Sequence, residues 1–511
     1  MTRGFGISSL VLLMLSLSMA RAQALPLSAL TVVYRFSFAN SERPTGVLVQ
    51  STDGTLYGVL SGGGANGGGA VFTFNGSGPP QTLYSFGGPS APVTDANGNI
   101  PVAGLVLGPD GNFYGSTAFG GPGENGTVYK ITPTGELTTL ASFGAAGQGQ
   151  NPSAPLFLAN DGYLYGTTSG GDSSYGTIYR IDPSTGSLQY VFKFPTDGSV
   201  GGGPYAGLVQ GTDGALYGTS DGGVGQNTGG GIYRLPLGGQ ATNIASLPPI
   251  LDNAMGGLVE GPDGAFYGLS TLGVSSGGFA YKVTTDGELI QLHAFGYDDS
   301  QVDGGYPTGA LILASDGNFY GVTSGGGIYN NGVIFQMTPD GTVTTMHAFT
   351  DSEGDMPTSG LMEGQDGRLY GMTQGVFTHN PTLFKLALIP APPTNLQATS
   401  TTNSVTLTWQ AVKSATTYNV YQGSTSGGES ASATLTQLAG TSATIAGLQP
   451  NSTYYFRVTA TNEAGEGAAS SETIGVTTAP ARSGGGGSID EWFVMTLGLA
   501  FFGRSRTQRL G

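Results

Sequence analysis

The chain has 511 residues with 33 acidic and 17 basic side chains, which give a net charge of −16, and it contains no cysteine and only three histidines. These counts exclude a disulfide scaffold, a cysteine-ligated metal site and a cysteine nucleophile, and they disfavour binding of nucleic acid through its phosphates. With 91 glycines, 28 prolines and few charges, the composition favours a glycine-rich β protein.

The first 24 residues have the pattern of a secretory signal peptide. Arg3 supplies the positive charge, Leu10–Met19 the apolar run, and Ala20-Arg21-Ala22 the small-residue cleavage pattern. The alternative is a transmembrane anchor, which the short run ending at Arg21 disfavours. We therefore expect signal peptidase to cut between Ala22 and Gln23 and the protein to be exported.

A repeat array follows, and its marker is the hexapeptide Asp-Gly-x-Leu/Phe-Tyr-Gly. Successive copies begin 50 to 57 residues apart, a period that is typical of propeller blades rather than helical solenoids. The seven copies are Asp53–Gly58, Asp110–Gly115, Asp161–Gly166, Asp213–Gly218, Asp263–Gly268, Asp316–Gly321 and Asp366–Gly371.

Each repeat divides into four short strands. In one copy the strands are predicted at 155–158, 163–168, 176–181 and 188–194, with tight turns at 160–162 and 182–186 and a glycine-rich loop at 169–172. Four antiparallel strands are what a propeller blade requires.

The two ends of the array are complementary. The seventh marker is followed by a third strand at 382–388 but by no fourth, whereas an extra strand at 30–38 precedes the first marker. We expect the N-terminal strand to complete the last blade, which would remove an open sheet edge. The predicted fold is all-β, with a seven-bladed β-propeller over 29–389.

The repeats resemble those of the GloVer tandem-repeat proteins. The pattern is clearest at 104–135, where Gly-Leu-Val precedes the marker and Gly-Thr-Val-Tyr-Lys-Ile-Thr-Pro follows the glycine doublet. The resemblance implies an exported repeat body joined to one of several kinds of anchor, and it implies no catalytic residues. Kelch propellers share the period, but they place a tryptophan in each blade, and both tryptophans here lie outside the array.

Residues 390–480 resemble a fibronectin type III domain, a β-sandwich of two antiparallel sheets. The alternating segments Val405–Trp409, Tyr418–Tyr421 and Thr453–Thr461 are predicted strands. The resemblance assigns Trp409 to the core and Tyr454 to the tyrosine corner. We expect this domain to serve as a spacer.

The C-terminus combines a flexible linker over 481–488, the acidic pair Asp490-Glu491, an apolar run from Trp492 to Phe502 and three arginines. As a helix the run would span roughly 17 Å, less than the ~30 Å of a hydrocarbon core. The segment 489–511 resembles the GlyGly-CTERM sorting tails of Gram-negative bacteria. That resemblance implies cleavage by a rhomboid-type protease near Gly484, Gly485, Gly486 and Gly487. It further implies attachment at the cell surface or outer membrane, through the segment itself or a lipid that replaces it, or release from the cell.

The repeated marker residues are interpreted as structural. A stacking platform for sugars is the alternative for the tyrosines, but residues repeated at one blade position usually fill one packing slot. His293 and His347 occupy equivalent positions in adjacent repeats, and His379 lies in a loop. None forms a recognisable catalytic triad with a serine or carboxylate.

Two neighbouring blade-to-blade loops are rich in acidic residues and are candidates for Ca²⁺ binding through carboxylate oxygens. The alternative interpretation is solvated charge that aids solubility. The candidate ligands are Asp298, Asp299 and Asp303 in the first loop and Asp351, Glu353 and Asp355 in the second.

The predicted function is that of a non-enzymatic binding or structural module. Because the long loops lie on one face of the predicted ring, we expect a glycan or protein ligand there. The alternative is an extracellular polysaccharide lyase or hydrolase that uses loop carboxylates such as Asp303 and Asp355 as general acid and base.

Overall fold

The computed structural model describes residues 29–88, 96–144, 149–171, 175–197, 199–204, 206–220, 230–247, 256–272, 277–296, 302–375 and 379–480. The predicted leader 1–24, the linker 481–488 and the tail 489–511 lie outside these ranges, and with them Ala22, Gln23 and Gly484–Gly487. The described residues are all-β except for one short 3₁₀ helix, η1 (Phe38–Asn40). They include no helix with the length and apolar character needed to cross a membrane.

Residues 29–387 form seven small antiparallel sheets, which we number along the chain. Sheet 1 contains β2 (Pro44–Gln50), β3 (Leu56–Leu60), β4 (Ala70–Phe74) and β5 (Gln81–Ser85). Sheet 2 contains β6 (Asn99–Pro101), β7 (Val106–Leu107), β8 (Phe113–Phe119), β9 (Thr127–Ile131) and β10 (Leu137–Ser142). Sheet 3 contains β11 (Phe157–Leu158), β12 (Leu164–Thr168), β13 (Thr177–Ile181) and β14 (Leu188–Lys193).

The pattern repeats through the next three sheets. Sheet 4 contains β15 (Val209–Gln210), β16 (Leu216–Ser220), β17 (Gly231–Leu235) and β18 (Thr242–Ser246). Sheet 5 contains β19 (Val259–Glu260), β20 (Phe266–Ser270), β21 (Phe279–Val283) and β22 (Leu289–Ala294). Sheet 6 contains β23 (Gly305–Leu313), β24 (Phe319–Gly325), β25 (Val333–Met337) and β26 (Val343–Ala348).

Sheet 7 joins the two ends of the array. It contains β27 (Met362–Glu363), β28 (Leu369–Met372), β29 (Thr382–Ala387) and the N-terminal strand β1 (Ala29–Arg35). Leu30 lies opposite Leu386, and Arg35 lies opposite Thr382, so the predicted pairing of the first strand with the last is confirmed. The strand ends at Arg35 rather than at Phe38, because the chain turns there into η1.

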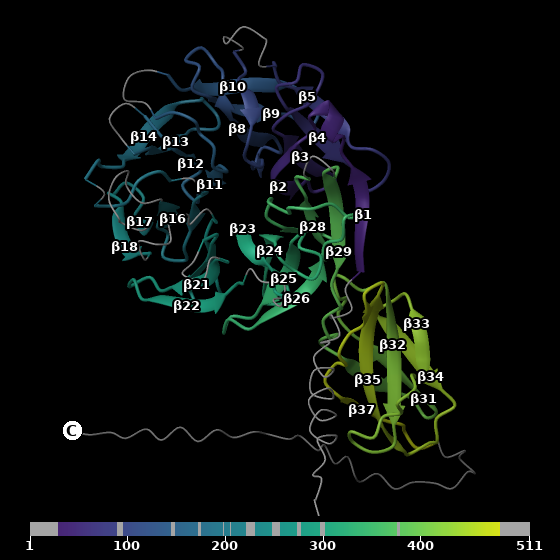
Figure 1. Ribbon diagram of the computed structural model, residues 1–511. Coiled ribbons are helices and arrows are strands. Elements are labelled where there is room, and N and C mark those ends of the chain that lie inside the picture. The colour runs from purple at the N-terminus through teal and green to yellow at the C-terminus, as the bar shows by residue number, and fades with distance from the viewer. Residues whose placement is uncertain are drawn as a thin grey trace, which may run out of the picture.

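Figure 1 shows the seven sheets following one another around a ring, with β1 beside β29. On one side of the ring, a backbone N–H just before a marker donates to a side chain of the next sheet. Such bonds run from Asn160 to Gln210, from Thr212 to Glu260, from Ser315 to Glu363 and from Gln365 to Gln50. The last of these joins sheet 7 to sheet 1 in the same way as the others join consecutive sheets.

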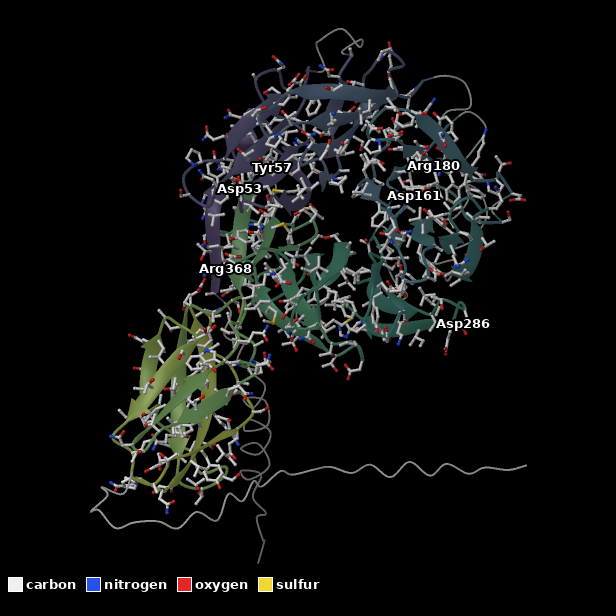
Figure 2. All side chains as sticks on the ribbon, turned by 180° about the vertical axis from the view of Figure 1, so that it is seen from behind. Asp53, Tyr57, Asp161, Arg180, Asp286 and Arg368 are labelled. Carbon is white, nitrogen blue, oxygen red and sulfur yellow. The ribbon has the colours of Figure 1, made fainter. Side chains whose placement is uncertain are left out.

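The marker aspartate fixes the turn between the first two strands of each sheet. In all seven copies its Oδ1 accepts the backbone N–H two residues further on. In six copies its Oδ2 also accepts the hydroxyl of the marker tyrosine, at 2.7–3.0 Å. Figure 2 shows two of these turns from behind, with Asp53 near Tyr57 and Asp161 near Arg180. The aspartate is thus a turn residue, as predicted, and it also holds the tyrosine.

The marker tyrosines pack inside the protein. All except Tyr370 are buried, and three of them lie against an aromatic ring of the next sheet, such as Tyr57 on Phe113 with centroids 3.9 Å apart. This burial confirms the packing interpretation and leaves no exposed platform for sugars at these positions.

The glycine after each marker tyrosine leaves room for an aromatic ring from the third strand. A Cβ placed there would lie 2.3–2.5 Å from the nearest atom of that aromatic side chain in every copy, for example 2.4 Å from the Tyr233 hydroxyl at Gly218. The full set of rings is Phe72, Tyr129, Tyr179, Tyr233, Tyr281, Phe335 and Phe384. The Tyr-Gly step is therefore explained by packing within and between sheets.

Residues 397–476 form a sandwich of two antiparallel sheets. One contains β30 (Gln397–Ser400), β31 (Ser404–Thr408) and β34 (Ser442–Ala446). The other contains β32 (Thr417–Gly423), β33 (Leu435–Leu438), β35 (Thr453–Asn462), β36 (Gly465–Glu466) and β37 (Thr473–Val476). Trp409, Phe456 and Val458 are in its core, and the hydroxyl of Tyr454 accepts the backbone N–H of Gln449.

The pairing of β1 with β29 can be tested by removing it. A chain that begins at Ser41 lacks β1 and exposes the edge of β29, so we expect its unfolding temperature to fall by on the order of 10 °C and the protein to associate. A synthetic peptide of residues 29–40 should restore the melting temperature, which calorimetry measures. The same peptide with proline at Val32 and Tyr34 cannot pair and should not restore it. Full stability without β1 would contradict this role.

The Tyr-Gly step can be tested by adding one methyl group. Gly218→Ala forces a Cβ into the Tyr233 ring, so we expect the free energy of unfolding to fall by ~1–3 kcal/mol. The matched control is Gly170→Ala, where the new Cβ meets no atom within 4 Å and the change should stay within ~0.5 kcal/mol. Denaturant titration of both variants measures the difference, and equal stability of the two would contradict the packing role.

Candidate binding surface

The two sides of the ring differ in their connections. The marker turns and the turns between the third and fourth strands lie on one side, which we call the turn face; in sheet 3 these are the hydrogen-bonded turns at 159–162 and 182–186. The glycine-rich loops between second and third strands, together with the sheet-to-sheet connections, lie on the other side, which we call the loop face. This is the arrangement expected from the spacing of the repeats.

The C-terminal sandwich contacts the turn face. Arg368, in the marker turn of sheet 7, donates from Nε and Nη2 to the two carboxylate oxygens of Glu463, at 2.6 and 2.8 Å. Lys413 of the sandwich lies 3.0 Å from Glu363, and the side-chain amide of Asn462 donates to the Leu388 carbonyl. Because these contacts use marker turns, the sandwich leaves the loop face uncovered.

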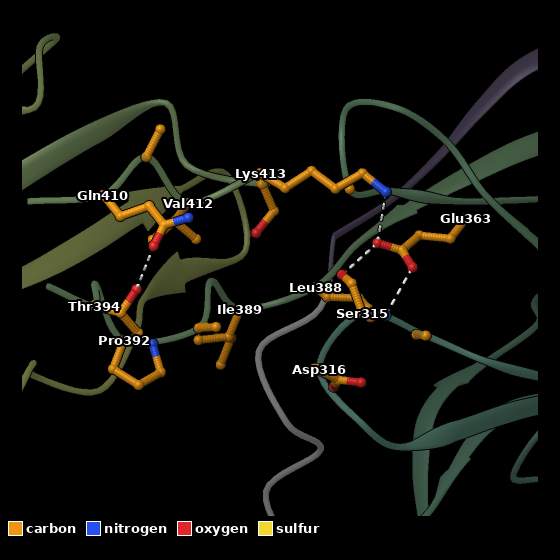
Figure 3. Close-up of a pocket in the computed structure, with 15 residues that line it drawn as sticks. Ser315, Asp316, Glu363, Leu388, Ile389, Pro392, Thr394, Gln410, Val412 and Lys413 are labelled. Atoms are coloured by element: carbon orange, nitrogen blue, oxygen red, sulfur yellow. Dashed lines mark hydrogen bonds and ion pairs between the residues drawn. The ribbon is translucent and has the colours of Figure 1, made fainter. Parts of the chain in front are cut away.

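A cleft of about 390 Å³ lies beside this contact. Figure 3 shows that its polar side chains are largely engaged with one another. Glu363 accepts hydrogen bonds from both Ser315 and Lys413, and the Gln410 side-chain oxygen accepts the Thr394 hydroxyl. The cleft is therefore best described as part of the junction between ring and sandwich.

A larger cavity of about 520 Å³ lies on the axis of the ring. Each sheet contributes a small residue from the innermost strand or from the segment leading into it: Val47, Ala103, Pro155, Ala206, Gly257, Ala310 and Ser359. Among the described residues that line it there is no charged side chain and no aromatic ring. The cavity therefore suits an uncharged group better than an ion.

Hydroxyl groups fix the wall of this cavity by joining adjacent sheets. Thr45 donates to the Val102 carbonyl at 2.9 Å, and Thr308 donates to the Pro357 carbonyl at 3.0 Å. Thr167, Thr219 and Thr271 make the same kind of bond to the carbonyl of Pro204, Gly256 and Pro307, respectively. The cavity wall thus consists of small side chains, and threonine hydroxyls that are bonded to carbonyls of the adjacent sheet hold it in place.

The predicted carboxylate loops are organised around the three histidines. The pairs are His293 Nε2 with Asp303 Oδ2 at 2.7 Å, His347 Nε2 with Glu353 Oε2 at 3.0 Å, and His379 Nδ1 with Asp355 Oδ2 at 3.0 Å. Asp351 instead accepts from the Asn331 amide. Burial opposes ionisation of Glu353, but hydrogen bonds from the Thr350 N–H and from His347 outweigh it and lower the pKa of this carboxyl.

These pairings bear on the predicted calcium ligands. Asp298 and Asp299 lie outside the described residues, and among the residues that the structure does describe, no group of three acidic or histidine side chains is arranged to hold a metal. One carboxylate oxygen each of Asp303 and Asp355 is buried without a hydrogen-bond partner in that same part of the chain. Calcium binding at these loops stays a prediction.

Sequence reasoning missed two features. The histidine–carboxylate pairs had a visible signal, since His-Ala-Phe recurs in adjacent repeats with an acidic residue six or ten positions after the histidine. The axial cavity had none, because it is formed by small residues from all seven repeats.

Comparison with known proteins gives a family match and several partial similarities. The model of the Gloeobacter/Verrucomicrobia repeat matches residues 90–250 and 224–441. Chitinase A1 of Niallia circulans is 38% identical over 111 residues, which are 21% of this chain and 14% of that protein. A tail tube protein of Bacillus phage SPP1 is 40% identical over 97 residues, which are 19% of this chain and 34% of that protein. The chain thus covers about a third or less of these curated relatives.

Two solved structures align with this chain over different lengths. The extracellular domain of a hybrid two-component system protein of B. thetaiotaomicron aligns over 89% of this chain and 58% of its own, with a TM-score of 0.45 and 12% identity. An Fn3-like protein from Clostridium thermocellum aligns over 19% of this chain and 100% of its own, with a TM-score of 0.16 and 30% identity.

The junction between ring and sandwich should weaken in acid. The hydrogen bonds from Arg368 lower the pKa of Glu463 below its ordinary value of 4.5, against a smaller opposing effect of burial. The folded protein therefore binds this proton less readily than the unfolded chain. The resulting stabilisation is complete above pH 4.5 and is lost as the pH falls through the lower, folded pKa. Since Glu463 is 39% exposed, we expect it to amount to less than ~1 kcal/mol.

Small-angle scattering of a chain covering 29–480 measures this effect. We expect the wild type to become more variable in shape between pH 5 and pH 3. Glu463→Gln should already show part of that variability at pH 7 and change less in acid. Glu472→Gln, a carboxylate that bonds only within the sandwich, should behave as the wild type. Identical profiles for all three proteins would contradict the docking role of Glu463.

Proposed function

The chain belongs to the Gloeobacter/Verrucomicrobia repeat family, and from that premise we propose that it is an exported tandem-repeat protein that binds a ligand without transforming it. The repeat array is a seven-bladed β-propeller over 29–389, followed by a fibronectin type III domain over 390–480. Seven sheets of similar order, the β1–β29 pairing and the Gln365–Gln50 bond between sheets 7 and 1 support the propeller. The sandwich topology and the Tyr454–Gln449 bond support the second domain.

The axial cavity is the observation that carries the binding function. It is larger than the cleft beside the sandwich, and its volume of about 520 Å³ lies within the range of ~300–1,000 Å³ that is typical of ligand sites. The lining residues that the structure describes include no nucleophile paired with a base and no pair of carboxylates. It is suited to holding a group in place, and it has none of the side chains needed for acid–base chemistry.

The position of the sandwich supports the same proposal. It contacts the turn face through Arg368 and Lys413, so it acts as a stalk that leaves the loop face open to a ligand. Export by the N-terminal segment and attachment through the C-terminal tail would place that face outside the cell. Calcium held by the acidic loops would stiffen the same face.

The proposed binding role can be tested by narrowing the cavity. Ala310→Leu adds apolar volume at the axis, so we expect it to weaken binding of any cavity ligand by about tenfold or more. Ala431→Leu, an exposed position in the sandwich, is the matched control and should leave binding unchanged. Glycan and protein arrays probed with the exported chain identify the ligand, and titration measures the affinity.

The same arrays decide between binding and catalysis. Turnover of a polysaccharide that is lost in Asp303→Asn or Asp355→Asn would overturn the proposal in favour of a lyase or hydrolase. If the wild type and Ala310→Leu bind every ligand found with equal affinity, the axial cavity is not the binding site.

A further inference from the structure

One backbone feature recurs on the loop face in five of the seven sheets. The residue that precedes a proline, at the start of the innermost strand or of the segment leading into it, has a positive φ. The five residues are Ile100, Asn151, Gly203, Tyr306 and Met356, and their φ angles lie between 52° and 59°. We call these five the rim positions.

Each rim position contacts the preceding sheet through a backbone hydrogen bond and through the proline that follows it, and we call these two contacts the clasp. Its backbone N–H donates to a carbonyl in the glycine-rich loop of that sheet; the acceptors, in order, are Gly68, Asn125, Tyr175, Gly277 and Asn331, at 2.5–3.3 Å. The proline that follows is buried. Its ring packs on a glycine of the same loop, such as Pro101 on Gly69, where a Cβ would lie 2.6 Å from the ring.

The clasp does not require the side chains that three of these positions carry. The left-handed region suits glycine and asparagine, and the residue before a proline is further restricted to extended conformations. Asn151 and Gly203 form the clasp with residues that tolerate this backbone. Ile100, Tyr306 and Met356 adopt it at a conformational cost. Glycine or asparagine would form the same turn at these three positions with less strain.

The rim positions lie two or three residues before residues that line the axial cavity. The chain passes from each of them through the buried proline into residues that line the cavity, among them Val102, Ser153, Ala206, Thr308 and Thr358. The side chains of Ile100, Asn151 and Tyr306 are half-buried, and that of Met356 is exposed. The same backbone arrangement thus places four different side chains, from four sheets, close in sequence to the cavity wall.

We propose that the rim positions select the ligand, and that the ligand is a basic polypeptide segment with an apolar side chain that enters the axial cavity. This inference rests on the proposed binding function. The uncharged lining of small side chains fits an apolar group, and Ile100, Tyr306 and Met356 add apolar surface at the entrance. Methionine and tyrosine side chains adapt readily to protein partners.

Charge favours a basic partner over other polypeptides. The chain carries a net charge of −16, and among the acidic residues in connections on the loop face Asp351 is exposed while Asp303 and Glu353 are half-buried. Such a surface attracts positively charged segments and repels acidic ones. A glycan is less favoured, because no aromatic ring is present among the described lining residues for a sugar to stack on.

The experiment uses the full mature chain and a displayed library of random peptides as the probe. Peptides are selected on the wild type, and their affinities are then measured for Ile100→Gly and Met356→Gly. We expect an enrichment of basic peptides with one apolar residue and a loss of about tenfold in affinity for each variant. The unfolding temperature should stay equal or rise, because glycine relieves the positive φ. A merely structural role would lower stability and binding together.

The matched control is Ile328→Gly on the same face. Ile328 is 56% exposed, is not followed by proline and has no positive φ, so its replacement should change affinity by less than about twofold. If selected peptides lose binding in Ala310→Leu but bind both rim variants as tightly as the wild type, the rim inference fails while the binding function stands. If glycans bind in a rim-dependent manner and peptides do not, the polypeptide assignment fails. If no peptide or glycan distinguishes wild type from Ala310→Leu, the proposed function itself fails.

Discussion

The pairing of β1 with β29 is the contact on which the arrangement of the other sheets depends. Each sheet packs its marker tyrosine against the next one, and five of the seven also bond to it through their glycine-rich loop. A row of seven sheets would therefore have two ends that lack these contacts. Leu30 opposite Leu386 and Gln365 bonded to Gln50 give sheet 7 the same neighbours as any other sheet. The axial cavity is lined by all seven sheets because sheet 7 contacts sheet 1.

The marker hexapeptide is a small unit that connects three levels of structure. Its aspartate closes a turn, its tyrosine packs on the next sheet, and its second glycine admits a ring from the third strand. Because the hexapeptide occurs seven times, the same kind of contact between adjacent sheets also forms seven times. Differences between repeats can then gather in the loops without disturbing the ring.

The two faces of the ring carry different kinds of contact. The turn face carries the marker turns, which have the same geometry in every sheet, and it contacts the sandwich, whose Glu463 binds Arg368. The loop face carries the histidine–carboxylate pairs, the clasped residues before proline and the entrance to the cavity. The bond from the Met356 N–H to the Asn331 carbonyl and the packing of Pro357 on Gly332 hold Met356 in an unfavourable backbone conformation on the loop face.

The sequence by itself determined the all-β class, the seven repeats, the strands within them and the partner of the N-terminal strand. These follow from local turn chemistry and from alternation, which act over a few residues at a time. Only the tertiary structure decided which carboxylate each histidine meets, that Arg368 holds the sandwich, and that small residues enclose a space on the axis. Those features bring together side chains from separate repeats or domains, and spacing along the chain does not encode the distance between them.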